Sequence, residues 1–305
     1  MIDRRGFLQT LALGPALGDL GSGFSLWAAE PRFRYAVCNE LFENWKFDAV
    51  CRAIKKAGFT GVEIAPFTLA EHVDEITTAR RRELRDIMKS EGVEFAGLHW
   101  LLITPKWLHV STADRQIREK SWQYFLKLID LSSDLGKGIM VLGSPKQRGV
   151  QGNTKQEATE NLKAGLASVA SHAAARGITV CLEPLASKDT EVVNTLDEAA
   201  RIVKSIGHPA IQTMFDFHNT ADEREPFEVL VHRHFKLIRH VHINEMNGWH
   251  LRTGGFDFLP VLQTLAKSGY RHWISLEVFD FKPGPERILK ESMDVLRSLE
   301  VRLKQ

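Results

Sequence analysis

Four ionisable side chains follow short apolar runs in the second half of this 305-residue chain: Glu183, Asp216, His242 and Glu277. Taken singly, each carboxylate is readily explained as a salt bridge or a helix cap, and His242 as a hydrogen-bonded core histidine. Three carboxylates gathered in one place would instead repel one another and lose hydration, unless a cation offsets the cost. The set therefore predicts one divalent metal site, to which His242 adds a neutral nitrogen ligand.

The ligand types limit the choice of metal. Three carboxylates and one imidazole make a mostly hard site, which favours Mn²⁺, Mg²⁺ or Co²⁺ and keeps Zn²⁺ as a further candidate. The sequence does not choose among them.

The four side chains need elements that bring them together, and the chain pattern supplies these elements. Short β-rich runs alternate with polar loops and longer amphipathic segments, which is typical of βα units around a parallel sheet. Glycines such as Gly58, Gly177 and Gly207 repeatedly mark a helix end before the next strand. The predicted strands are Phe33–Val37, Gly61–Ile64, Glu94–Leu98, Gly138–Leu142, Ile178–Leu182, Ile211–Phe215, Ile238–Ile243 and Trp273–Leu276. We therefore expect residues 31–305 to form a single α/β domain, a (β/α)₈ TIM barrel, with its active site at the strand ends.

Composition excludes several classes of partner. The formal net charge is only +2, so we expect no nucleic-acid partner and no electrostatic attraction to membranes. No stretch is long and apolar enough for a permanent transmembrane span. The three cysteines, Cys38, Cys51 and Cys181, are predicted to be small core residues. Whether the chain forms a homo-oligomer is left open.

Residues 1–30 differ from the rest of the chain. Arg4-Arg5-Gly6-Phe7-Leu8 precedes a mildly apolar stretch rich in Leu, Ala and Gly, which is similar to a twin-arginine export signal. We expect export to the periplasm through this segment. The alternative is a cytoplasmic protein with a chance arginine pair in its tail.

Further polar residues at the predicted strand ends are candidates for substrate binding. His99 and Trp100 follow the third strand, and we expect them to bind a sugar by hydrogen bonding and stacking, or else to pack under a loop. Lys146 and Arg148 lie in a basic loop after the fourth strand, where they would grip an anionic group or form a solvated loop. Glu40 and Glu63 would line the pocket or serve the fold, and His240 is expected deeper in the barrel.

The motifs around these residues resemble the xylose-isomerase-like sugar phosphate isomerase/epimerase superfamily, and in particular ketose 3-epimerases of the D-tagatose 3-epimerase kind. The matching motifs are Leu182-Glu183-Pro184-Leu185, Asn194-Thr195, Phe215-Asp216-Phe217-His218-Asn219, His240-Val241-His242-Ile243, Gly255-Phe256-Asp257-Phe258 and Ser275-Leu276-Glu277. The resemblance covers the chain from about Phe33 to its end. It implies that Glu183 and Glu277 bind metal and form the catalytic acid/base pair, with Asp216 and His242 completing the metal shell.

Three positions depart from the pattern of these relatives. Gly248 stands where the relatives commonly carry a substrate-contacting arginine, and Asp189 stands where they have a glutamate. His218 follows Asp216 by two residues, where many relatives place histidine three residues after. Asp189 and His218 remain candidate substrate-binding residues, and the departures leave the particular sugar open.

These observations predict a metal-dependent sugar isomerase or epimerase that moves a proton through a metal-stabilised enediolate. The first alternative is a metal-dependent lyase or hydrolase acting on oxidised (3-keto) sugars or glycosides. Phosphodiester hydrolysis, as in endonuclease IV, would require more histidines at the strand ends and a basic surface. A carbohydrate-binding barrel without catalysis would not need the pair Glu183 and Glu277.

Overall fold

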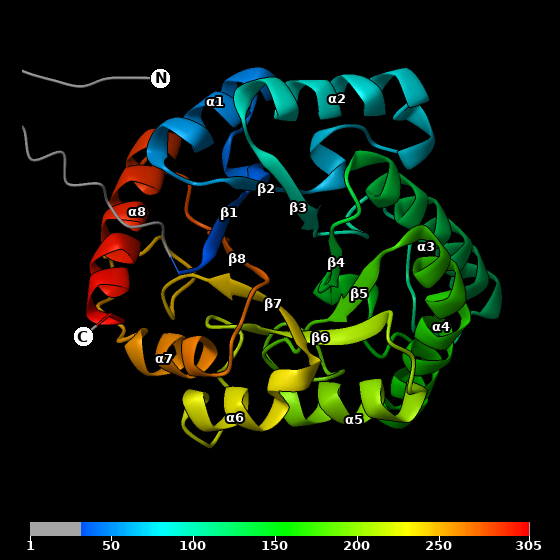
Figure 1. The fold of residues 1–305 in the computed structure, drawn as a ribbon. Coiled ribbons are helices and arrows are strands. Elements are labelled where there is room, and N and C mark those ends of the chain that lie inside the picture. The colour runs from blue at the N-terminus through cyan, green and yellow to red at the C-terminus, as the bar shows by residue number, and fades with distance from the viewer. Residues whose placement is uncertain (1–31, 305) are drawn as a thin grey trace, which may run out of the picture. The chain divides into compact units, whose positions relative to one another are not determined.

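The computed structural model describes residues 32–304, and in this range it has the predicted architecture. Eight parallel strands pair in sequence order, and β1 pairs with β8 to close the barrel. Figure 1 shows the helices forming a ring outside these strands. The strands are β1 (Arg34–Cys38), β2 (Gly61–Ile64), β3 (Glu94–Leu98), β4 (Ile139–Leu142), β5 (Thr179–Leu182), β6 (Ile211–Asp216), β7 (Ile238–Ile243) and β8 (Trp273–Leu276). The TIM-barrel prediction is confirmed.

Eight α-helices alternate with the strands, and five short 3₁₀ turns lie in the loops between residues 32 and 304. The α-helices are α1 (Phe47–Ala57), α2 (Thr78–Glu91), α3 (Arg115–Leu135), α4 (Lys155–Arg176), α5 (Leu196–Ile206), α6 (Phe227–His234), α7 (Leu259–Lys267) and α8 (Pro285–Arg302). The 3₁₀ turns are η1 (Asn39–Leu41), η2 (Pro66–Thr68), η3 (Val73–Glu75), η4 (Pro145–Gln147) and η5 (Phe235–Leu237).

Local sequence signals explain where α4 begins and ends. Thr154 and Glu157 form a capping box, in which each side chain accepts a hydrogen bond from the other residue's backbone N–H. At the other end Gly177 adopts a left-handed conformation with φ of 70° and donates its N–H to the last turn. A side chain would strain this conformation, so glycine sets the point at which the chain turns into β5.

Inside the barrel, alternate residues of each strand point toward the axis and the others point toward the helices. On β7 this alternation places His240 and His242 on the same face, and both are fully buried. Asp216 at the end of β6 pairs with His242, which in turn pairs with Ser275 on β8. The register therefore brings the polar ends of three neighbouring strands to one level.

No helix between residues 32 and 304 is long and apolar enough to cross a bilayer. The expected export segment, residues 1–30, lies outside the described residues.

Candidate metal centre and active-site pocket

The four predicted metal ligands converge at the carboxyl ends of strands β5 to β8. Glu183 and Glu277 each come one residue after a strand, whereas Asp216 and His242 are the last and the fifth residues of theirs. Each offers one ligand atom, and these four atoms all lie within 4.8 Å of one another. All four side chains are buried, the most exposed at 5%. The fold thus gathers three carboxylates and one imidazole in a single cavity.

The orientation of His242 fits a cation at this point. Its Nδ1 atom lies 3.1 Å from Oε2 of Glu277, 3.7 Å from Oε1 of Glu183 and 4.0 Å from Oδ2 of Asp216. Nevertheless Nδ1 has no hydrogen-bond partner among the described residues. A buried ring nitrogen without a hydrogen-bond partner is uncommon. Together with the three carboxylates that it faces, it forms a set of ligands suited to a divalent metal.

The electrostatics of the carboxylates lead to the same conclusion. Burial and the negative charge of Glu183 raise the pKa of Asp216 to about 7. Burial also raises the pKa of Glu277 above its ordinary value. These carboxyl groups resist ionisation together because their charges lie close to one another and away from water. A divalent cation would relieve this repulsion and would let all of them ionise.

Glu63 on β2 contacts His242 at Nε2, the ring nitrogen that does not face the three carboxylates. Its two carboxylate oxygens lie 2.7 Å from Nε2 of His240 and 3.2 Å from Nε2 of His242, and all three side chains are completely buried. A carboxylate at Nε2 fixes the proton on that nitrogen, which leaves the Nδ1 lone pair directed at the metal position. Burial alone would raise the pKa of Glu63, but electrostatic attraction to His240 and His242, together with their hydrogen bonds, keeps it well below its usual range.

Asn219 is a site residue that the sequence analysis missed. Its amide nitrogen donates to Oδ2 of Asp216 at 2.8 Å and to Oε1 of Glu183 at 3.3 Å. It lies three residues after Asp216, a spacing that in hindsight could have indicated it. Gly143 after β4 also serves the site, since a β-carbon there would collide with Oε2 of Glu183.

A cavity of about 190 Å³ is lined by two of the candidate metal ligands, Glu183 and Glu277. Four of the predicted substrate-binding residues line it together with Glu183 and Glu277, namely His99, Trp100, Asp189 and His218. Trp100 and Phe279, which also line it, contact each other edge to face, with ring centroids 6.3 Å apart. This pocket is where a small molecule could reach both glutamates.

The basic loop after β4 is placed differently from the expectation. Lys146 is exposed to solvent and does not line the cavity. Arg148 is fully buried, and its guanidinium donates to the backbone carbonyls of Leu142 at 3.2 Å and Val193 at 3.4 Å. Arg148 therefore joins the loops after β4 and β5 through backbone hydrogen bonds, and it does not line the cavity.

Gly248 explains one departure from the resemblance. Its φ of 79° is left-handed, and a β-carbon there would collide with the ring of Phe279. An arginine at this position would therefore clash with Phe279. The backbone N–H of Phe279 also donates to the Gly248 carbonyl at 2.8 Å.

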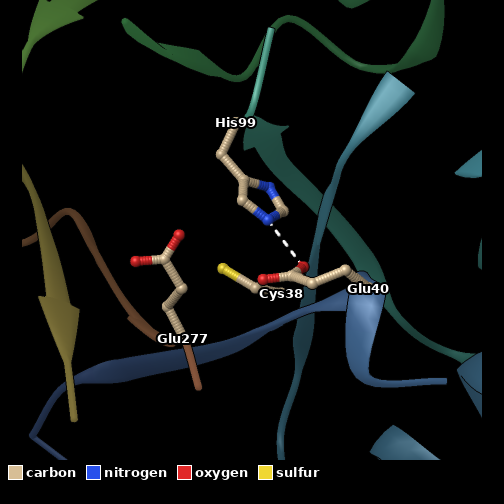
Figure 2. Close-up of side chains that lie close together, drawn as sticks. All are labelled: Cys38, Glu40, His99 and Glu277. Atoms are coloured by element: carbon tan, nitrogen blue, oxygen red, sulfur yellow. Dashed lines mark hydrogen bonds and ion pairs between the residues drawn. The ribbon is translucent and has the colours of Figure 1, made fainter. Parts of the chain in front are cut away.

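A second polar cluster lies beside the metal ligands at the ends of β1 and β3. His99 Nε2 lies 2.6 Å from Oε2 of Glu40, and Figure 2 shows Cys38 and Glu277 directed toward this pair. Burial opposes a charge on His99, but the Glu40 carboxylate raises the pKa of its ring. Cys38, Cys51 and Cys181 are all buried core residues, as predicted. The Sγ atom of Cys38 also lies within 4.8 Å of ligand atoms of Glu40, His99 and Glu277.

Comparison with known proteins agrees with this geometry. L-ribulose 3-epimerase of Mesorhizobium japonicum is 27% identical over 188 residues, which cover 60% of this chain and 62% of that enzyme. The chain thus spans less than two thirds of that relative's length. A ketose 3-epimerase of Arthrobacter globiformis is 30% identical over 120 residues, which cover 39% of this chain and 41% of that enzyme. 3-Dehydro-D-guloside 4-epimerase of Escherichia coli is 23% identical, over 81% of this chain and 92% of the enzyme.

Solved structures show the same fold. A D-psicose 3-epimerase determined in the presence of D-fructose superposes with a TM-score of 0.76 at 19% identity, over 90% of this chain and 100% of that one. The relatives found by sequence are sugar epimerases. The family model described as xylose isomerase-like TIM barrel matches residues 51–299, most of the barrel. The chain therefore belongs to the xylose isomerase-like TIM barrel family.

Proposed function

We propose that the protein is a divalent-metal-dependent sugar epimerase or isomerase that moves a proton on a carbon beside a carbonyl group. One observation carries the proposal: Glu183 from β5 and Glu277 from β8 line the same small pocket, and each has an oxygen within 4.8 Å of Nδ1 of His242. Two carboxylates that share a cavity and a cation position can act as a proton acceptor and a proton donor for one substrate.

Glu183, Asp216, His242 and Glu277 would hold the cation, for which Mn²⁺, Mg²⁺ and Co²⁺ are the best candidates. When bound, the cation would draw electron density from the sugar carbonyl and its neighbouring hydroxyl, and so make the carbon-bound proton more acidic. Asn219 would fix the carboxylate of Glu183 through its amide hydrogen bond.

The two glutamates come from strands β5 and β8, with β6 and β7 between them. A proton taken by one carboxylate and returned by the other to the opposite face inverts the carbon, which is epimerisation. A proton returned to the adjacent carbon converts a ketose into an aldose. In both cases no bond other than C–H and O–H bonds changes its partners.

A second candidate is a lyase that eliminates the group attached beside the proton-transfer site. The favouring observation is a large groove that adjoins the pocket through Trp100 and Phe279 and offers room for a leaving group. Incubation of the metal-loaded protein with free, phosphorylated and 3-keto sugars in heavy water distinguishes the two. Deuterium uptake at carbon without cleavage supports the epimerase or isomerase, and release of the attached group supports the lyase.

We also propose that residues 1–30 direct export by the twin-arginine route. The support is the Arg4-Arg5 pair and the mildly apolar stretch that follows it. A periplasmic enzyme of this kind would act on sugars taken up from outside the cell.

A further inference from the structure

A wide aromatic groove lies beside the pocket. It has a volume of about 890 Å³ and runs along the loops after β1, β2, β3 and β8. We call it the aromatic groove and define it by the aromatic residues that line it: Phe42, Trp45, Phe47, Phe67, Trp100, Phe279 and Phe281. Trp45, Phe67 and Phe279 are 40%, 36% and 41% exposed. Large apolar side chains gathered at an open surface mark a binding site more often than a structural one.

The aromatic groove adjoins the active-site pocket, with which it shares two lining residues. Trp100 and Phe279 line both cavities and so form the boundary between them. Trp100 holds a left-handed backbone conformation with φ of 49°, which is costly for a bulky residue and is typical of functional sites. The backbone thus places the indole at the junction, where one ligand could touch the metal ligands and the groove at the same time.

Size and charge indicate what the aromatic groove would accept. The pocket is smaller than the range of about 300–1,000 Å³ in which drug-sized ligands bind, whereas the groove lies inside that range. The charged residues along the groove are four carboxylates (Glu40, Glu43, Asp48 and Glu83) and two cations (Lys46 and Arg80). An excess of carboxylates disfavours a phosphate, and aromatic faces favour an uncharged ring.

We infer that the substrate is an uncharged keto-glycoside whose aglycone carries an aromatic ring. The sugar ring would occupy the pocket, and the aglycone would pass Trp100 and lie against Trp45 and Phe67. This inference rests on the proposed function. Because the anomeric carbon of a glycoside is locked in an acetal, the carbonyl that acidifies the proton must lie on another ring carbon. The substrate is therefore the product of a reaction that oxidises a ring hydroxyl.

A matched pair of ligands tests the inference, namely the methyl and the phenyl glycoside of the same 3-keto-glucose. With the metal-loaded full-length protein, calorimetry should show the phenyl glycoside binding about tenfold more tightly than the methyl glycoside. Trp45→Ala and Phe67→Ala should each remove most of this difference and leave the affinity for the methyl glycoside unchanged. Trp107→Ala is the control, because Trp107 is 45% exposed but does not line the aromatic groove.

Equal affinity for the two glycosides, or a phenyl preference that survives both groove substitutions, would overturn the inference. Deuterium exchange into each glycoside is measured in parallel to separate this outcome from failure of the proposed function. Exchange with equal affinities rejects only the aromatic aglycone. Absence of exchange into both glycosides and into free sugars rejects the proton-transfer function itself and, with it, the inference.

Discussion

Nδ1 of His242 lies 3.1 Å from Oε2 of Glu277, at the point where neighbouring strands β7 and β8 end. Without a cation between them, the lone pair on Nδ1 and the negative carboxylate repel each other, unless one of the two groups binds a proton. With a divalent ion both atoms become ligands. The metal proposal depends on this contact more than on any single side chain.

Removal of the His242 imidazole tests whether this residue binds the metal. His242→Ala should lower the affinity for Mn²⁺ by more than about 100-fold, because even the loss of an outer partner of a metal ligand typically costs about 10- to 100-fold. Metal content after dialysis measures the effect. His232→Ala is the control, since His232 is exposed on α6, and unchanged metal content in His242→Ala would remove this residue from the ligand set.

Glu183→Gln and Glu277→Gln should each reduce deuterium exchange into the substrate by at least about 100-fold, since a positioned acid or base contributes about 10²- to 10⁴-fold. Circular dichroism should show an intact fold for both variants. Glu160→Gln, at an exposed carboxylate on α4, controls for the loss of a charge. Full exchange activity in either pocket variant would exclude that glutamate from the proton transfer.

Glu63 would act on the metal only through His242, with which it shares a hydrogen bond. Glu63→Gln keeps the shape of the side chain but removes the charge that fixes the histidine proton. We expect the Mn²⁺ affinity to fall by about 10- to 100-fold. A merely structural role would lower the thermal stability and leave the metal affinity of the folded protein unchanged, and that result would reject the positioning role.

The raised pKa of Asp216 predicts a pH dependence. Its folded pKa of about 7 lies above the ordinary value of 3.8, so the folded protein holds this proton more tightly than the unfolded chain does. The metal-free protein should therefore lose stability as the pH rises from about 4 to about 7. Mn²⁺ binds the ionised form, so its addition should raise Tm more at about pH 8 than at about pH 5.5.

Asp216→Asn provides the control for this prediction, because an amide cannot titrate. The variant should bind Mn²⁺ weakly, and the Tm of its metal-free form should change less with pH across the same range. Equal Tm increments for the native protein at both pH values would contradict the assignment of Asp216 as a ligand that competes with a proton.

Much of the fold could be predicted because strand and helix ends are marked locally. Glycines such as Gly177 adopt the left-handed conformation that ends a helix, and the next strand begins shortly after them. The observed strands therefore begin and end within about one residue of the predicted ones. The four candidate ligands could be predicted because closure of a barrel brings successive strand ends to one rim. Their joint type and position were sufficient without any knowledge of side-chain orientation.

Other features depend on loop paths, which periodicity does not encode. Arg148 was expected to face an anion, but its loop turns the guanidinium inward onto backbone carbonyls. The pairing of Glu40 with His99 joins loops 59 residues apart, and that of Glu63 with His240 spans 177 residues. Such pairs follow from the closed barrel and not from local spacing.

The proposed export segment is tested with a reporter fused after residues 1–29. The native segment should carry the folded reporter to the periplasm, and replacement of Arg4-Arg5 by two lysines should abolish export, because the arginine pair is the part that the export machinery reads. Cell fractionation provides the measurement. A reporter that remains in the cytoplasm with the native segment would reject the export proposal.

The most direct test of the central claim is an anomalous-difference map from crystals of the Mn²⁺-soaked protein. One strong peak is expected in direct contact with Glu183, Asp216, His242 and Glu277, with Nδ1 of His242 as the nitrogen ligand. A peak that omits two or more of these residues, or full occupancy at a different place in the barrel, would contradict it.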